Sequence, residues 1–112
     1  MNIDHIARVC HEANKAWCEA HGDFSQKSWA EAEEWQREAT YAGVRLRLEH
    51  PEAPKSAQHD YWMNEKLEKG WIYGEVKDGE RKTHPSLVPF EDLSEFDQKK
   101  DLLFAAIVEA LK

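Results

Sequence analysis

The stretch Ile3–Ala20, which reads IDHIARVCHEANKAWCEA, carries the clearest structural signal in the chain and decides its fold class. Its apolar residues recur in steps of three and four, at Ile3, Ile6, Cys10, Ala13, Trp17 and Ala20. That spacing gathers them on one face of an α-helix, and Gly22 follows as a stop signal. On a flank of the same helix, His11, Asn14 and Cys18 fall together. The stretch therefore predicts an amphipathic first helix in a mainly helical fold.

A second helix is expected after Ser28, because Ser28 followed by Glu31 is a capping-box pattern. This helix should begin at Trp29 and end before Pro51. It has two apolar sides, one formed by Trp29, Ala32, Trp35, Ala39, Ala42 and Leu46 and the other by Tyr41, Val44 and Leu48. A helix that is apolar on two sides is either central to the core or shared with a partner.

Two further helices follow from similar signals. A third helix should follow Ser56 and end at Gly70, and Ser94 with Asp97 should cap the last one. One face of the third helix is formed by His59, Trp62, Met63 and Lys66. The apolar residues of the last helix are Phe96, Leu103, Phe104, Ile107, Ala110 and Leu111.

Between these helices, residues 71–84 carry a hairpin signal. The run from Trp71 to Val76 has strand character, and Asp78–Gly79 is a favoured two-residue turn. In that register Tyr73 faces His84, and one face of the hairpin presents Trp71, Tyr73, Glu75, Lys82 and His84. The predicted fold is therefore mainly α with minor β: four helices and a small β-hairpin in one domain covering residues 1–112.

The predicted hairpin face has two interpretations. It is either an aromatic packing face edged by an ordinary ion pair, which is the commoner use of such strands, or a binding surface. Lys100 bears on the choice, because it falls in line with Phe96 and Phe104 on the apolar face of the last helix. Its ammonium group either extends to solvent or points into a cleft, where it meets an acidic side chain or an anionic ligand.

The bulk composition limits the classes of partner. The chain has 112 residues, is 41% hydrophobic and carries a formal net charge of −7. This composition indicates a globular domain and disfavours binding to long nucleic acids, whereas a small anion needs only a local positive spot. Cys10 and Cys18 would lie about 12 Å apart on a helix, which is too far for a disulfide. With no signal peptide and no apolar run long enough for a membrane span, a cytoplasmic location is expected.

Searches for catalytic and metal-binding patterns give negative results. The run His11–Glu12–Ala13–Asn14–Lys15 resembles the start of a zincin helix, but its fifth residue is not a second histidine. No Walker loop, nucleophile elbow or CxxC pair occurs, and no two histidines lie four residues apart. We therefore expect no enzyme activity, no catalytic residues, no metal site and no cofactor.

Several motifs together resemble the RyR domain, a small module found in tandem copies in ryanodine receptors and as a stand-alone domain in bacterial and phage proteins. The matching residues are His59–Asp60–Tyr61–Trp62, Lys66, Gly70–Trp71–Ile72–Tyr73–Gly74, Lys82–Thr83–His84–Pro85, Leu87–Val88–Pro89–Phe90, Leu93, Lys100–Asp101 and Phe104. His11, Glu12 and Asn14 match the prokaryotic members. The resemblance implies a compact, mainly helical fold with a small hairpin and no known catalytic activity. It also implies pairing of copies, here as a homodimer.

Prokaryotic and viral members of this family have been proposed to sense nucleotide-derived immune signals. The resemblance and the residues together favour a small-molecule binding module for such an anionic, nucleotide-like ligand. It would act as a sensor, or as a phage-type protein that sequesters the signal. The expected ligand-binding residues are Trp71, Tyr73, Lys82, His84, Lys100, His59, Trp62, His11 and Asn14. The alternative is a protein-interaction or assembly module without a small ligand, and a concave site lined by these residues would favour the first hypothesis.

Overall fold

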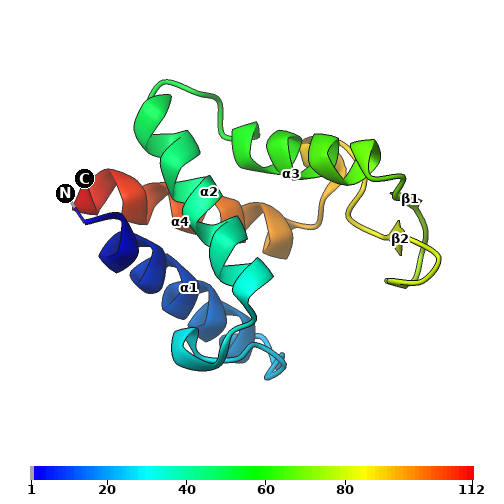
Figure 1. The fold of residues 1–112 in the computed structure, drawn as a ribbon, viewed down its shortest axis with the longest axis horizontal. Helices are drawn as coiled ribbons and strands as arrows, with labels where there is room; N and C mark the ends of the chain where they lie inside the picture. Colours follow the sequence, from blue (N-terminus) through cyan, green and yellow to red (C-terminus); the bar gives the residue numbers. More distant parts are fainter. Residues whose placement is uncertain (1) are drawn as a thin grey trace.

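A computed structural model describes residues 2–112 of the chain, and its architecture is mainly helical, as predicted (Figure 1). The elements in order are α1 (Ile3–Ala20), η1 (Trp29–Glu31), α2 (Glu34–Glu49), α3 (Ala57–Glu68), β1 (Ile72–Tyr73), β2 (Thr83–His84), η2 (Phe90–Asp92) and α4 (Glu95–Leu111). Helices α1, α2 and α4 pack together, and α3 with the two short strands extends away from them (Figure 1). Both chain ends lie on the same side of the molecule (Figure 1).

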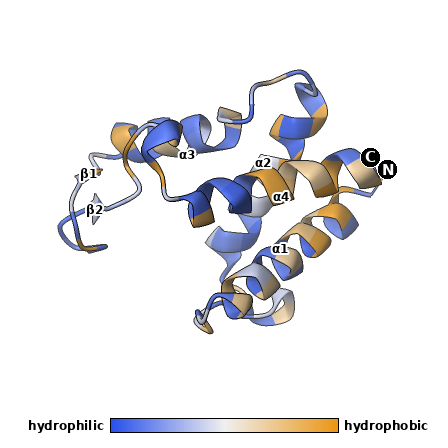
Figure 2. Ribbon diagram, turned by 180° about the vertical axis from the view of Figure 1, so that it is seen from behind, coloured by the Kyte–Doolittle hydropathy of each residue, from blue (hydrophilic) through white to orange (hydrophobic). Residues whose placement is uncertain are grey.

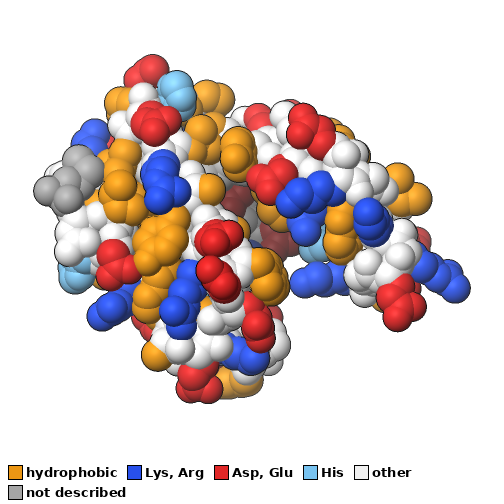
Figure 3. All heavy atoms as spheres, viewed as in Figure 1, with side chains coloured by type: hydrophobic (Ala, Val, Ile, Leu, Met, Phe, Trp, Pro, Cys, Tyr) orange, Lys and Arg blue, Asp and Glu red, His pale blue; other side chains and the backbone are white. Residues whose placement is uncertain are grey.

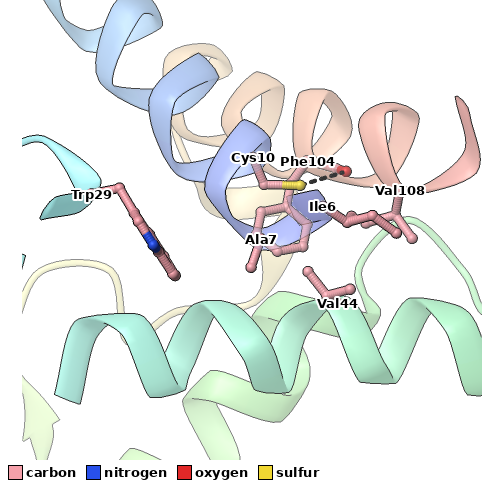
Figure 4. Packing of buried hydrophobic residues seen from close by; sticks show 7 residues of the cluster. All are labelled: Ile6, Ala7, Cys10, Trp29, Val44, Phe104 and Val108. Atoms are coloured by element: carbon pink, nitrogen blue, oxygen red, sulfur yellow. Dashed lines mark hydrogen bonds between the residues drawn. The ribbon is translucent and has the colours of Figure 1, made fainter. Parts of the chain in front are cut away.

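The hydrophobic core lies between α1, α2 and α4. Its buried members are Ile6, Ala7, Cys10, Trp29, Val44, Phe104 and Val108, which converge from these helices and from η1 (Figure 4). Apolar stretches run along α1 and α4, whereas much of α3 is hydrophilic (Figure 2). The first predicted helix is confirmed over Ile3–Ala20, because its apolar stripe places Ile6 and Cys10 against the core. Both cysteines are free thiols, and both are buried.

The predicted start of the second helix is wrong. Trp29 begins a short 3₁₀ turn, and Ala32 then adopts an extended conformation (φ −64°, ψ 147°), so α2 starts only at Glu34. The Ser28 hydroxyl lies 3.4 Å from the Glu31 carboxylate and does not cap the backbone. Trp29 is still buried, because the 3₁₀ turn folds it onto α1 and Tyr41.

The two apolar sides of α2 have different surroundings. Val44 is fully buried in the core, with Tyr41 and Leu48 packed beside it. The other side does not face the core: Trp35 is 65% exposed. Helix α2 is thus central, with one side on the core and the other turned toward α3.

The predictions for α3 and α4 agree with the structure at their ends. Ser94 accepts a hydrogen bond from the Asp97 backbone N–H at 3.2 Å and caps α4. Gly70 ends α3 in the left-handed conformation (φ 89°), which lets the Trp71 N–H reach the Lys66 carbonyl oxygen at 3.0 Å. Within α4, Val108 belongs to the core, whereas Leu111 is exposed.

The predicted antiparallel hairpin is wrong, because β1 and β2 run parallel, with Ile72 opposite Thr83 and Tyr73 opposite His84. The connecting chain doubles back on itself. Asp78 accepts hydrogen bonds from the N–H groups of Glu80 and Arg81 and pairs with Thr83 through an antiparallel bridge. A two-residue turn would reverse the chain once and give antiparallel strands. This loop reverses it a second time, so β2 runs alongside β1 in the same direction.

Gly74 is required where the two strands meet. A Cβ atom at Gly74 would lie 2.6 Å from the Thr83 Cβ, which is too close for any other residue without a shift of the strands. The predicted pairing of Glu75 with Lys82 is not formed, since the strand pairs end at Tyr73 and His84. Within residues 2–112, no helix has the length and apolar character that a membrane crossing requires.

Candidate functional site

A cleft of about 740 Å³ separates α3 from α2 and α4 (Figure 3). On the α2 side it is bordered by Ala39, Ala42 and Gly43, whose small side chains leave space between the helices. A Cβ at Gly43 would lie 3.0 Å from the Phe104 ring and 3.3 Å from the Gln58 amide nitrogen. The three helices therefore approach closely at Gly43, and the cleft opens beside this contact.

The lining of the cleft combines aromatic rings with charges of both signs. Its aromatic and imidazole side chains are Trp35, His59, Tyr61, Trp62 and His84. Its charged side chains are Glu38, Glu65, Lys66, Lys69, Asp97, Lys100 and Asp101. Acidic side chains are visible in the depth of the hollow, and basic ones lie along its α3 edge (Figure 3).

His59 and Trp62 form an aromatic wall on α3. The His59 Nε2 atom lies 2.6 Å from the Val88 carbonyl oxygen, so Nε2 carries a proton and donates it to this bond. The Trp62 ring lies 5.6 Å from the His59 ring and 5.0 Å from the His84 ring, the latter edge-on. These contacts position Trp62 between α3 and β2.

His84 is oriented by the backbone that follows it. The Ser86 N–H donates a hydrogen bond to the His84 Nδ1 atom at 3.0 Å, which leaves Nε2 as the protonated nitrogen of the neutral ring. Burial lowers the pKa of His84, and the positive charges of Lys77 and Lys66 lower it further. The imidazole is therefore a neutral hydrogen-bonding group at pH 7 and lies in a locally positive field.

Two lysines reach the cleft from different helices. The Lys66 ammonium lies over the Trp71 ring, 4.4 Å from its centre, and burial is the main cause that lowers its pKa. The Lys100 ammonium lies 3.3 Å from an Asp97 carboxylate oxygen and 5.3 Å from the centre of the Phe96 ring. Of the alternatives for Lys100, the structure has the one in which it lines a cleft and meets an acidic side chain.

Asp101 is a half-buried carboxyl group in the cleft. Its pKa is raised by burial, although His59, Lys100 and Arg47 each lower it through their positive charge. Arg47, on α2, is itself buried and donates hydrogen bonds to Gln58 and to the carbonyl oxygens of Pro54 and Lys55. Arg47 thus fastens the connector before α3 and is not hydrogen-bonded to Asp101.

The structure brings together four of the nine sequence-predicted site residues, because His59, Trp62, His84 and Lys100 all line the cleft. Trp71 lies just outside it, against Lys66 and 6.5 Å from the His84 ring. Tyr73 is exposed, and Lys82 turns its ammonium group to the Lys69 carbonyl oxygen at 2.9 Å. The parallel pairing of the strands is the reason, since the predicted single face of the hairpin does not exist.

His11 and Asn14 lie on α1, outside the lining of the cleft. His11 is buried against Trp29, and its Nε2 atom lies 2.7 Å from the Lys27 carbonyl oxygen. The neighbouring Glu12 carboxylate accepts a hydrogen bond from the Trp29 N–H at 2.8 Å. These contacts fasten the segment before η1 to α1. The Asn14 side-chain oxygen is buried without a hydrogen-bond partner among residues 2–112.

Sequence reasoning did not select Asp97 and Asp101 as site residues. A usable signal was present, because Asp97, Lys100 and Asp101 are spaced by three and four residues and share one face of α4. Trp35 and Tyr61 were missed at the rim for another reason: their position depends on how α3 sits against α2. Between Asn2 and Lys112, no group of three His, Cys, Asp or Glu side chains is close enough to hold a metal ion.

The model of the RyR domain family matches residues 49–112. The matched segment contains α3, both strands and α4, and it includes every cleft residue named above except those on α2. It covers more than half of the chain. On this match, the chain belongs to the RyR domain family.

Proposed function

We propose that this protein is a small-molecule binding module for an anionic, nucleotide-derived ligand, and that the ligand binds in the cleft between α2, α3 and α4. The observation that carries the proposal is the convergence of Trp62, His84 and Lys100 on one cleft of about 740 Å³. That volume falls within the range of about 300–1,000 Å³ typical of small-molecule sites. A module of this kind needs no catalytic residues.

Aromatic side chains would hold the base of such a ligand. Trp35 and Tyr61 are more than half exposed at the rim, and Trp62 lies deeper. Stacking of a base on an aromatic ring contributes about 1–3 kcal/mol and tolerates different bases. The free rim rings favour a planar ligand, because their apolar faces are otherwise in contact with water.

The positive end of the cleft would hold the phosphate. Lys66 lies on α3 and Lys69 is the residue that caps its C-terminal end. Burial lowers the pKa of His84, and the positive charges of Lys77 and Lys66 lower it further, which supports a positive potential at this end. The chain as a whole carries a net charge of −7, so this spot differs in sign from the average surface. A small anion is attracted to such a spot, and a long nucleic acid is repelled by the rest of the surface.

A thermal-shift panel tests the proposal with AMP, 3′,5′-cyclic AMP, a cyclic dinucleotide and ADP-ribose. A ligand at 100 times its Kd stabilises a protein by about 2.7 kcal/mol, so binding raises the Tm measurably. Lys66→Met should weaken the binding of the active compound about tenfold, because the phosphate loses a charged contact at the positive end of the cleft. The matched control is Lys99→Met, because Lys99 is paired with Glu95 on the exposed side of α4. If no compound raises the Tm, the proposal is wrong.

The biological role remains part of the proposal. We propose that the domain senses a nucleotide signal or sequesters it, in the cytoplasm and as a homodimer. Sensing and sequestration can be distinguished by adding the purified domain to a mixture of the signal and an effector that responds to the signal. Sequestration requires that the domain lower the free signal in proportion to its own concentration.

A protein-interaction module is the second candidate, and a different surface favours it. Leu67, Ile72, Tyr73 and Val76 are large apolar side chains that are at least half exposed around the strands. They lie outside the cleft. Multi-angle light scattering of the ligand-free protein and of the variant Ile72→Ser with Val76→Ser tests this candidate, because assembly through this surface gives a mass above that of one chain which the variant loses. A mass of one chain at all concentrations argues against it.

A further inference from the structure

Asp101 is a half-buried acidic group whose carboxylate makes no hydrogen bond or ion pair among the described residues. It lies on α4 and lines the cleft between Lys100 on its own helix and His59 on α3. Among residues 2–112, no side chain or backbone group donates a hydrogen bond to its carboxylate, and no cation lies within ion-pair distance. A half-buried carboxylate is only partly hydrated, and its acceptor sites that have no partner in the protein are open to a donor on a ligand. The arrangement calls for a hydrogen-bond donor that the protein itself does not supply.

The cations that surround Asp101 are engaged elsewhere. Arg47 is hydrogen-bonded to Gln58 at 2.8 Å and to two backbone carbonyl oxygens at 3.2 and 3.1 Å. Lys100 is paired with Asp97 at 3.3 Å, and the His59 Nε2 proton is directed at the Val88 carbonyl oxygen at 2.6 Å. Each of these groups lowers the pKa of Asp101 at a distance, yet burial outweighs them and the pKa is raised. The carboxylate is thus held in the cleft with its acceptor sites open.

The position of Asp101 separates the cleft into two chemically different ends. At the C-terminal end of α3 the cleft is lined by Lys66 and by Lys69, which pairs with Glu65. On α4 it is lined by Asp101 and by Asp97, which pairs with Lys100, so one positive charge is left over at the first end and one negative charge at the second. Acidic side chains are visible in the depth of the hollow, and basic ones at its α3 edge (Figure 3). A phosphate group is repelled from the acidic end, where a neutral group with hydrogen-bond donors is favoured. A ligand that satisfies both ends has an anionic part and a hydroxyl-bearing part.

We propose that Asp101 accepts hydrogen bonds from the vicinal 2′- and 3′-hydroxyl groups of a ribose, so that the cleft selects ribonucleotides whose two ring hydroxyls are free. The inference rests on the proposed function, since it assigns one part of the ligand that the cleft would hold. The chemistry is general, because a carboxylate has enough acceptor sites to accept one hydrogen bond from each of the two hydroxyl groups. Ribose hydroxyl groups are recognised by Asp or Glu in dinucleotide-binding folds. Deoxyribose, or a ribose with a 3′,5′-cyclic phosphate, lacks one of the two donors.

The test compares AMP and ADP-ribose with 2′-deoxy-AMP, 2′,3′-dideoxy-AMP and 3′,5′-cyclic AMP by isothermal titration calorimetry. In the unchanged protein, AMP should bind about 10- to 100-fold more tightly than its dideoxy analogue, as expected for loss of hydrogen bonds to a charged group. Asp101→Asn should weaken AMP by a similar factor and leave the dideoxy analogue unaffected. The control Asp92→Asn makes the same chemical change at an exposed carboxylate outside the cleft lining and should leave both affinities unchanged.

The outcomes separate this inference from the function on which it rests. If AMP and its dideoxy analogue bind equally well, the ribose assignment is wrong while nucleotide binding stands. If none of the five compounds binds, the proposed function fails, and the ribose assignment fails with it. If Asp101→Asn weakens both compounds equally and its circular dichroism and Tm match those of the unchanged protein, Asp101 contacts another part of the ligand, and the assignment is again overturned.

Discussion

The three-helix core and the α3 segment are held together by different kinds of contact. Between α1, α2 and α4, apolar side chains such as Ile6, Val44 and Val108 are almost fully buried against one another (Figure 4). The segment from α3 to η2 is fastened largely by polar and aromatic contacts. Arg47 attaches it to α2 through hydrogen bonds to Gln58 and to the connector before α3. Within the segment, His59 is hydrogen-bonded to Val88, and Leu87 and Phe90 are its buried apolar residues.

The difference explains where the cleft lies. Apolar packing fills space, because close-packed side chains leave few voids. Directed polar contacts hold two parts at fixed points and leave space between those points. The cleft occupies this seam, so its residues come from both sides: Trp62 from the α3 segment, and Lys100 and Asp101 from α4. Four variants test this comparison.

The largest effect is expected in the three-helix core. Ile6 is 1% exposed, and Ile6→Ala should lower the free energy of unfolding by about 3 kcal/mol, since it removes buried methyl groups and leaves a cavity. Urea denaturation followed by tryptophan fluorescence measures the loss. The control is Leu102→Ala on α4, which is 42% exposed and should cost no more than about 0.5 kcal/mol. Equal losses at the two positions would contradict the packing described for the core.

A smaller but localised effect is expected at Arg47. Arg47→Met should cost about 2 kcal/mol, because the carbonyl oxygens of Pro54 and Lys55 and the Gln58 side chain lose their donor. Hydrogen exchange should speed up in α3 more than in α1, as the segment detaches before the core unfolds. Arg45→Met, at an exposed residue of the same helix, is the control. Uniform acceleration across all helices would show that the segment has no separate stability.

Asp101→Asn should stabilise the ligand-free protein at pH 7.5, by an amount on the order of 1 kcal/mol. The pKa of Asp101 is raised in the folded state, so its contribution to stability is fully present below its unfolded pKa of about 3.9 and is lost as the pH rises through the folded value. The charged groups that face it are Arg47 from α2, His59 from α3, and Lys100 and Asp97 from α4.

Other titrating groups are the same in Asp101→Asn and in the unchanged protein. The difference between their free energies of unfolding therefore reports the titration of Asp101 alone. That difference should grow from pH 4 to pH 7.5 when measured by urea denaturation at each pH. A variant that is less stable than the unchanged protein at pH 7.5 would mean that the carboxylate is compensated within the protein. The combination of higher stability and weaker ligand binding is the signature expected of a binding residue.

The smallest effect is expected around the strands. Ile72 and Val76 are 60% and 73% exposed, so Ile72→Ser with Val76→Ser should change the free energy of unfolding by no more than about 0.5 kcal/mol. Thermal denaturation at low protein concentration measures it. A larger loss, or one that grows with protein concentration, would indicate that these side chains are covered by a second copy of the chain.

Sequence reasoning was accurate where a structural signal is local. The stripe in α1 and the Ser94 cap of α4 depend on residues within a few positions of one another, and both are confirmed. It was wrong where a tertiary contact outweighed a local preference. Ser28 and Glu31 suit a helix start, yet Trp29 is buried in a 3₁₀ turn fastened to His11 and Glu12 of α1, and this tertiary contact overrides the capping pattern.

The candidate site was predicted in part for the same reason. Residues on helical faces, such as His59, Trp62 and Lys100, were found because their orientation follows from helical spacing and Ser94 fixes where α4 begins. Tyr73 and Lys82 were placed by an assumed strand register. The register depends on the loop around Asp78, which bonds to Glu80, Arg81 and Thr83 and reverses the chain again. Tyr73 still lies opposite His84, but the strands run parallel, so the other pairs of the antiparallel hairpin are not formed and the predicted surface does not exist.

The sequence by itself determined the helices, the family and the presence of a lysine on the apolar face of α4. Helical periodicity and motif spacing are properties of short segments, so they can be identified without knowledge of the tertiary contacts. Only the tertiary structure decided that the α2 side with Ala39, Ala42 and Gly43 borders a cleft and that Asp101 lies in it without a partner. Burial and the absence of a hydrogen bond depend on groups brought together from α2, α3 and α4, and no single segment carries that information.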